Sequence, residues 1–156
     1  LKLYGVMGFQ KKRLLHCFKG FVLLDLGLNN LIYRETQDFK LDRFKAFVDF
    51  SPSFLDANER INSNWKYEKL IESYQGQTLI GYVIFQRHLG MVSQLGVRKD
   101  YRGQGVGKAL LKYVQQDCQR PLTLMNVPSK ANGMLQFLGK IGLVNYVDQY
   151  EMEMIL

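Results

Sequence analysis

Apolar and polar residues alternate along this chain with two periods, one of two residues and one near 3.6. The period of two predicts strands, and the longer period predicts amphipathic helices. Strands are expected at residues 31–35, 67–74, 77–86, 89–97, 121–127, 143–147 and 150–155. Helices are expected after Asp38, at 54–61, from Val106 and after Ser129, and residues 12–25 have a mixed, strand-like pattern.

The apolar content of individual segments indicates which strands lie inside the sheet. Segment 77–86 is heavily apolar, which is typical of a central strand. Near the other end, Tyr150 and Met152 alternate with Glu151 and Glu153, so one face of that strand is expected to be buried and the other hydrated. The order of strands and helices predicts an α/β domain built on a mixed sheet.

A glycine-rich turn lies between the strand at 89–97 and the helix that begins at Val106. We call residues 102–108, with the sequence RGQGVGK, the glycine loop. A helix N-terminus leaves about four backbone N–H groups without intrahelical acceptors and carries partial positive charge. Residues without a Cβ let a phosphate approach these groups, and Arg102 and Lys108 add full charge. The loop is therefore predicted to bind phosphate, the alternative being a strand-to-helix turn without a ligand.

The spacing of the glycines excludes two common phosphate-binding motifs. A P-loop has four residues between its first glycine and the Gly-Lys pair, whereas three separate Gly103 from Gly107. The dinucleotide fingerprint requires a third glycine where Lys108 stands. The remaining pattern, R-x-x-G-x-G after a strand with L-x-V, resembles the coenzyme A pyrophosphate loop of the GNAT superfamily of acetyl-CoA-dependent N-acyltransferases. The resemblance spans residues 31–156 and is strongest at 95–111.

This resemblance implies a fold, a cosubstrate and a reaction. The expected fold is the GNAT-like mixed sheet flanked by helices, in which strands 89–97 and 121–127 run parallel and splay apart. The implied reaction is direct attack of an amine, on a small molecule or peptide, on acetyl-CoA in a ternary complex, and no metal is expected. Strand 89–97 would hold the pantetheine arm through its backbone, and the glycine loop the pyrophosphate. The predicted cofactor-binding residues are Leu95, Gly96, Val97, Arg102, Gly103, Gln104, Gly105, Val106, Gly107, Lys108 and Asn132.

The chain departs from the family pattern where protons must be moved. The superfamily commonly has a carboxylate on the strand before the loop, yet no Asp or Glu occurs between Ser73 and Lys99. Its tyrosine position holds Leu138, which cannot protonate a leaving thiolate. Glu72 and Asn126 are the predicted catalytic residues, although an exposed strand carboxylate and a satisfied strand end are alternative interpretations. Further candidates for the proton transfers are His88, Tyr74 and Tyr82.

The first residues resemble the last helix and turn of the same superfamily. Gly5 and Gly8 match Gly139 and Gly142 when the two segments are superimposed at an offset of 134 residues, and Leu1 meets Leu135. In both copies a glycine that can adopt the left-handed conformation ends a helix. We therefore predict that residues 1–27 are the tail of a preceding GNAT-like repeat or an N-terminal extension, and that 28–156 form the GNAT domain. The alternative is an unrelated helix that ends at a glycine.

Composition narrows the remaining possibilities. The formal net charge of +7 suits a polyanionic cofactor, and no aromatic-plus-basic signature of nucleic-acid binding is present. No apolar run reaches the ~20 residues of a membrane-spanning helix. The two isolated cysteines favour a cytoplasmic location. We expect either an N-acetyltransferase or a non-catalytic acyl-CoA-binding module of a tandem protein, assembled as a homodimer or with a preceding repeat.

Overall fold

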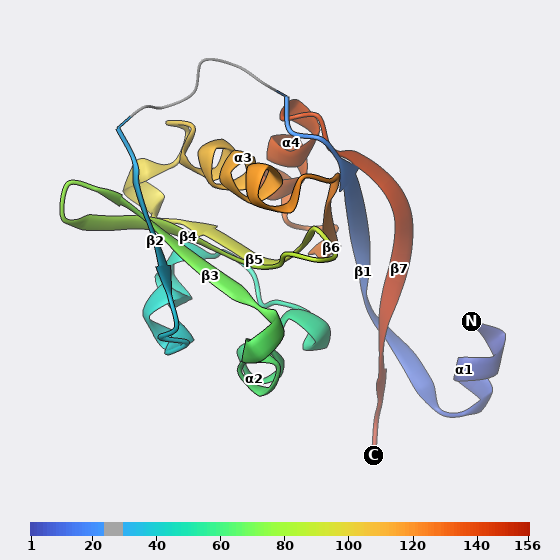
Figure 1. The fold of residues 1–156 in the computed structure, drawn as a ribbon. Helices are drawn as coiled ribbons and strands as arrows, with labels where there is room; N and C mark the ends of the chain where they lie inside the picture. The colour runs from blue at the N-terminus through green and yellow to red at the C-terminus, as the bar shows by residue number, and fades with distance from the viewer. Residues whose placement is uncertain (24–29) are drawn as a thin grey trace.

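The predicted mixed sheet is present in the computed structural model, which describes residues 1–23 and 30–156 (Figure 1). Within those residues the sheet has seven strands in the order β2-β3-β4-β5-β6-β1-β7. The strands are β1 Phe9–Gly20, β2 Ile32–Thr36, β3 Lys69–Gln75, β4 Thr78–Gln86, β5 Met91–Val97, β6 Leu122–Pro128 and β7 Val144–Met154. The α-helices are α1 Lys2–Val6, α2 Asn58–Ser63, α3 Val106–Cys118 and α4 Asn132–Lys140. Short 3-10 helices lie at Leu41–Phe47, Phe54–Asp56, Trp65–Tyr67 and Lys99–Tyr101.

Strands β5 and β6 form the parallel pair that the sequence predicts. Their ladder contains Met91 opposite Thr123 and Val92 opposite Leu124, and it ends there, although both strands continue. Beyond this point β5 stays paired with β4, and β6 stays paired with β1. The two strands therefore separate toward their C-terminal ends, which confirms the expected mixed sheet with splayed parallel strands.

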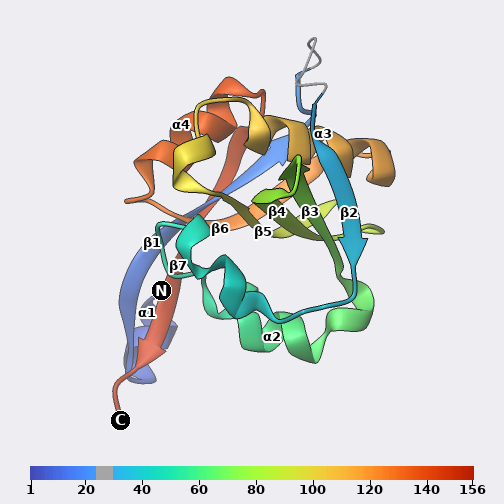
Figure 2. The ribbon, with the colours of Figure 1, turned by 90° about the vertical axis from the view of Figure 1, so that its left-hand side faces the viewer.

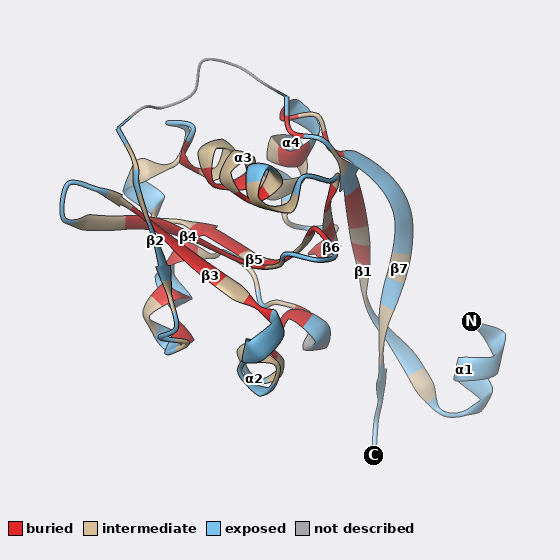
Figure 3. Ribbon diagram, in the orientation of Figure 1, coloured by how far each residue is buried: buried red, intermediate tan, exposed pale blue. Residues whose placement is uncertain are grey.

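Two layers of apolar side chains cover the sheet, one on each face. Helices α3 and α4 lie on one face, and α2 with the 3-10 helix Leu41–Phe47 lies on the other (Figure 2). The fully buried Leu110 and Val114 of α3 belong to the first layer, as the predicted helical period requires, and Leu111 is buried beside them. Phe44 stacks on Tyr82 in the second layer, with ring centroids 3.9 Å apart. Buried residues make up most of strands β3 to β6 (Figure 3).

Some elements differ from those predicted, for local physical reasons. The helix expected after Asp38 is a 3-10 helix, in which Leu41, Phe44 and Phe47 are buried at a spacing of three residues. That spacing aligns side chains on one face of a 3-10 helix. Segment 54–61 is divided by the extended residue Ala57 into a 3-10 turn and α2. The strands expected at 143–147 and 150–155 form one strand, β7, because β1 pairs along its whole length.

Strand β1, from the predicted tail 1–27, lies inside the sheet of the domain. It pairs antiparallel with β6 on one edge and with β7 on the other. The predicted boundary between residues 27 and 28 falls outside the described residues, and the assignment of the tail to a preceding repeat stays a prediction. In the described ranges, every helix is too short or too polar to cross a bilayer.

Candidate functional site

The glycine loop connects β5 to α3 through two left-handed residues. Gly103 has φ +73° and Gly105, the residue before α3, has φ +86°. Residues with a Cβ disfavour this region, so the sequence of glycines fixes a sharp reversal at the start of the helix. Val106 then enters the apolar core and anchors the first turn of α3.

Successive backbone amides of the glycine loop lie before the first intrahelical hydrogen bond of α3. The first intrahelical hydrogen bond is donated by the Ala109 N–H to the Gly105 carbonyl, at 2.9 Å. In the described part of the chain, the N–H groups of residues 103–107 donate to no protein acceptor. Unpaired amides at a helix N-terminus, together with the helix dipole, form a site for an anion. The loop therefore has the donors that a pyrophosphate needs.

The side chain of Arg102 is used inside the protein. Its Nε donates to the Val97 carbonyl at 2.9 Å and one terminal nitrogen donates to the Phe47 carbonyl at 3.0 Å. The other terminal nitrogen donates to the Asp49 carboxylate. Arg102 thus holds the loop against the end of β5 and the segment after Phe47. These three bonds give Arg102 a structural role in holding the loop. Its contact with pyrophosphate stays a prediction.

A cavity of about 1210 Å³ lies in front of the glycine loop. It is bounded by the end of β5, the loop and the N-terminal part of α4, and we call it the larger cavity. All predicted cofactor-binding residues except Gln104 line it. Gln104 instead donates from its side chain to the Asp100 carbonyl at 3.2 Å. The lining includes the cationic residues Lys12, Lys108, Lys130 and Lys140, so the larger cavity suits a polyanion.

Gly96 occupies a position in β5 where a side chain does not fit. A Cβ there would lie 2.5 Å from Cε1 of Tyr82 and 3.0 Å from Cβ of Phe47. Its absence lets the 3-10 helix Leu41–Phe47 pack directly on β5. Gly96 and Phe47 both line the larger cavity, so this contact forms part of its wall.

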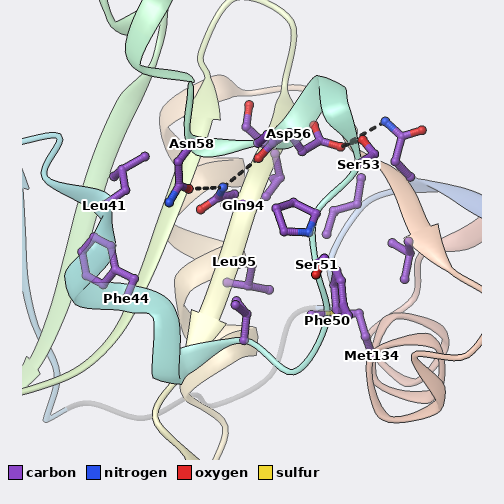
Figure 4. Close-up of a pocket in the computed structure, with 18 of the residues that line it drawn as sticks. Leu41, Phe44, Phe50, Ser51, Ser53, Asp56, Asn58, Gln94, Leu95 and Met134 are labelled. Atoms are coloured by element: carbon purple, nitrogen blue, oxygen red, sulfur yellow. Dashed lines mark hydrogen bonds between the residues drawn. The ribbon is translucent and has the colours of Figure 1, made fainter. Parts of the chain in front are cut away.

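A second, smaller cavity of about 620 Å³ adjoins the first (Figure 4). Both cavities are lined by Val48, Asp49, Phe50, Leu95 and Met134, so they meet where β5 separates from β6. The smaller cavity is otherwise bounded by the 3-10 helix Leu41–Phe47 and the start of α2. A long molecule in the larger cavity can therefore present one end to a second molecule in the smaller cavity.

A buried carboxylate, Asp56, lies in the smaller cavity. It is 8% exposed, and its Oδ2 accepts hydrogen bonds from Ser53 Oγ at 2.8 Å and Asn126 Nδ2 at 3.0 Å. Burial raises the pKa of Asp56, although the hydrogen bonds from Asn126 and Ser53 act in the opposite direction. Figure 4 shows the Gln94 amide joined to Asn58 and to the Asp56 backbone carbonyl, the latter at 2.7 Å.

The two predicted catalytic residues lie in different places. Asn126 lines the smaller cavity beside Asp56, with φ +64°, a left-handed conformation that is rare in a strand. Glu72 lines neither cavity. Its carboxylate accepts from Arg43 and from the Tyr74 hydroxyl, both at 2.8 Å. The alternative interpretation expected an exposed carboxylate at Glu72. In the structure this carboxylate is buried and paired.

Asp56 was not among the residues predicted from the sequence. It lies in a region without a diagnostic motif, and its partners are 3 and 70 residues away along the chain. The local signal was Ser53 three residues before Asp56, a spacing at which the hydroxyl can reach the carboxylate. Leu138 is fully buried and belongs to the apolar core on the α3 and α4 side of the sheet.

Comparison with known families decides the identity of the fold. A family model for the acetyltransferase (GNAT) domain matches residues 35–155. The chain belongs to the GNAT acetyltransferase family. Membership in this family supports acyl transfer in general, with an acyl-CoA as the usual donor. A search of curated proteins finds no match to this GNAT chain.

Solved structures share the GNAT fold at low sequence identity. A Drosophila protein superimposes with a TM-score of 0.67 and 14% identity, covering 99% of this chain and 55% of its own. A GCN5-related N-acetyltransferase from Sphaerobacter thermophilus gives 0.59 and 17%, covering 97% and 54%. AAC(6')-Iy, in complex with a CoA-containing bisubstrate analogue, gives 0.53 and 13%, covering 81% and 95%. The chain thus spans about half the length of the first two.

Proposed function

We propose that this GNAT domain is an N-acetyltransferase that transfers an acetyl group from acetyl-CoA to an amine. The observation that carries the proposal is the set of unpaired amides at residues 103–107, in a loop that borders a cavity adjoining one with a buried carboxylate. The first feature suits the pyrophosphate of coenzyme A, and the second suits proton removal from an amine.

The larger cavity has features that fit each part of acetyl-CoA. The glycine loop would hold the pyrophosphate, and Lys130 and Lys140, which line the same cavity, would add positive charge around the phosphates. The backbone of Leu95 to Val97, beyond the last β5–β6 pair, would accept the pantetheine arm as an added strand. The thioester would then lie near Leu95 and Met134, which line both cavities.

The smaller cavity would hold the acceptor amine. Among the described residues of its lining, Asp42, Asp49, Asp56 and Glu59 are acidic and Lys45 alone is basic. This excess of negative charge favours a cationic amine of a small molecule or peptide. Apolar contacts from Phe44 and Phe50 would surround the carbon skeleton of the acceptor.

Asp56 would act as the general base, directly or through a water. The cationic amine first loses one proton to Asp56, and the neutral nitrogen then attacks the thioester carbon. As the C–S bond breaks, the second N–H proton leaves through water and the sulfur departs as a thiolate. Both side-chain hydrogen bonds that Asp56 accepts in the described part of the chain end on Oδ2. Oδ1 would accept the proton, and a backbone N–H near Val97 would stabilise the oxyanion.

Turnover of acetyl-CoA with a panel of amines tests this proposal, with free thiol release as the signal. Calorimetry with coenzyme A measures binding separately. We expect micromolar binding and amine-dependent release of thiol. Absence of binding would contradict the acyl-CoA assignment itself.

A second candidate is a non-catalytic module that binds acyl-CoA in a tandem GNAT protein. Two observations favour it: Leu138 occupies the tyrosine position, and segment 73–99 carries no carboxylate. Binding of coenzyme A without turnover for any amine would select this function.

A further inference from the structure

The pairing of β1 with β7 has an internal two-fold symmetry. Leu15 pairs with Gln149, and these residues are 134 positions apart, the same offset that aligns Gly5 with Gly139. If 134 is added to the number of a β1 residue and subtracted from the number of its β7 partner, the two resulting numbers are again an observed pair. Leu14–Tyr150 becomes His16–Asp148, for example. The pair Leu15–Gln149 therefore lies on a pseudo-two-fold axis.

The irregularities of this ladder obey the same operation. The register shifts once between Lys11 and Arg13, where Lys12 is the extra residue. It shifts again opposite Cys17 and Phe18, where Tyr146 is the extra residue of β7. Lys12 and Tyr146 are also 134 positions apart. A chance antiparallel pairing has no reason to place its bulges at equivalent positions.

The helices that precede β1 and β7 end in the same way. Gly8 donates from its N–H to the Gly5 carbonyl at 3.1 Å, and Gly142 donates to the Gly139 carbonyl at 3.2 Å. The N–H of Met7 bonds to Leu3, and the N–H of Ile141 bonds to Phe137, at 3.2 and 3.1 Å. Gly8 and Gly142 are both left-handed, with φ +87° and +101°. The matching glycines, the hydrogen bonds at the helix ends and the strand pairing are thus all related by the same offset of 134 residues.

Burial breaks this symmetry. Leu138 and Ile141 of the α4 end are 0% and 4% exposed, whereas the equivalent Tyr4 and Met7 are 52% and 56% exposed. The same holds for the strands, because β1 has β6 on its second edge and β7 is the last strand of the sheet. Figure 3 shows α1 and much of β7 as exposed. The unpaired edge of β7, with its exposed apolar side chains, is a surface on which another strand can pair.

We infer that β1 and β7 are the exchanged last strands of two GNAT-like units. A unit that precedes this one in the same polypeptide would cover the apolar face of α1 and pair its own equivalent of β6 with the outer edge of β7. The sheet would then continue through β7 into the preceding unit. The inference concerns assembly and does not depend on the proposed activity.

A second copy of this chain does not meet the requirement. The symmetry demands a partner whose β6 edge is open, and in this chain that edge is occupied by β1. A preceding unit that ends in α1 and β1 has placed its last strand in the present sheet, so its own β6 edge is open to β7. Strand β1 also contributes Lys12, Arg13 and Leu14 to the larger cavity here. By symmetry, residues 146–148 would line the corresponding cavity of the preceding unit.

The intact native polypeptide tests the inference in two steps. Its sequence before Leu1 should contain a GNAT-like unit with its own glycine loop, and a native start near Leu1 would overturn the inference. Met7→Asp in that polypeptide should then lower Tm by about 5 °C or more, because it buries a charge. The matched control is Lys2→Asp, equivalent to the exposed Gln136 of α4, which should leave Tm within about 1 °C.

The same variants distinguish the other arrangements. Equal tolerance of Met7→Asp and Lys2→Asp would show that α1 faces solvent and would contradict the inference. Light scattering measures the oligomeric state of the native polypeptide and of the Met7→Asp variant. A dimer of the native polypeptide that Met7→Asp converts to monomers would place a second copy on α1 and would also overturn it.

Discussion

The Asn126 side-chain amide donates to the Asp56 carboxylate across 3.0 Å, and this bond joins β6 to the segment that enters α2. Asn126 adopts a left-handed conformation inside a strand, where most residues do not. Its Oδ1 accepts from Gln149 of β7. The bond therefore links three elements at the point where β5 and β6 have separated, and it orients the one buried carboxylate among the described lining of the smaller cavity.

Asp56→Asn should lower kcat without changing the affinity for acetyl-CoA. The substitution keeps the shape of the side chain and removes the base, so we expect a loss on the order of 10²–10⁴-fold. Glu72→Gln is the matched control, because that carboxylate is paired with Arg43 outside both cavities. Steady-state kinetics and calorimetry on both variants measure the effect. A larger loss of kcat in Glu72→Gln would transfer the role of base to Glu72.

The pH profile of kcat should reflect the raised pKa of Asp56. The base acts when it is deprotonated, so kcat falls as the pH decreases through the pKa of the folded protein. Because burial raises this pKa, the loss should begin above the range of an ordinary aspartate, about 3.9. Profiles with two amines of different pKa separate the enzyme from the substrate. An acidic limb that moves with the amine would argue against Asp56.

Gly105→Glu should weaken the binding of coenzyme A by about a hundredfold or more. A carboxylate at this position would repel the pyrophosphate at the helix N-terminus. Gly76→Glu is the control, since Gly76 is also left-handed, with φ +59°, and has open space around it in the β3–β4 turn. The control carries the same charge and a similar backbone strain. Equal calorimetric affinities for the two variants would refute the phosphate-binding role of the loop.

Asn126→Ala and Asn126→Gly should destabilise the fold to different extents. Both remove the hydrogen bonds to Asp56 and Gln149, at a cost of about 1–3 kcal/mol in the free energy of unfolding. Alanine adds about 1–2 kcal/mol because it disfavours the left-handed conformation, and glycine does not. Urea denaturation measures the difference. Identical losses for the two variants would mean that the backbone of β6 relaxes out of this conformation.

The glycine loop was predictable because its properties are local. Left-handed glycines, a helix N-terminus and an amphipathic helix depend on neighbours within a few residues, and the structure has all three at 103–118. The same reason explains the strands at 67–74, 77–86 and 89–97. All predicted cofactor-binding residues except the exposed Gln104 line the larger cavity, but the prediction did not include the residues that β1 and the segment 47–50 contribute to it.

The acceptor side was not predictable, because its contacts join distant segments. Arg102 meets Asp49 across 53 positions and Asp56 meets Asn126 across 70, and no sequence spacing signals either pair. Glu72 was predicted to be catalytic from its place on a neighbouring strand. That place does not reveal that Arg43 pairs with its carboxylate.

The sequence by itself determined the GNAT family, the turn that starts α3 and an offset of 134 residues between two helix ends. The tertiary structure decided that β1 enters the sheet between β6 and β7, and that Asp56 lies beside Asn126. Backbone conformation at a glycine or along a helix depends on nearby residues, whereas strand order and buried polar pairs depend on which distant surfaces exclude water together.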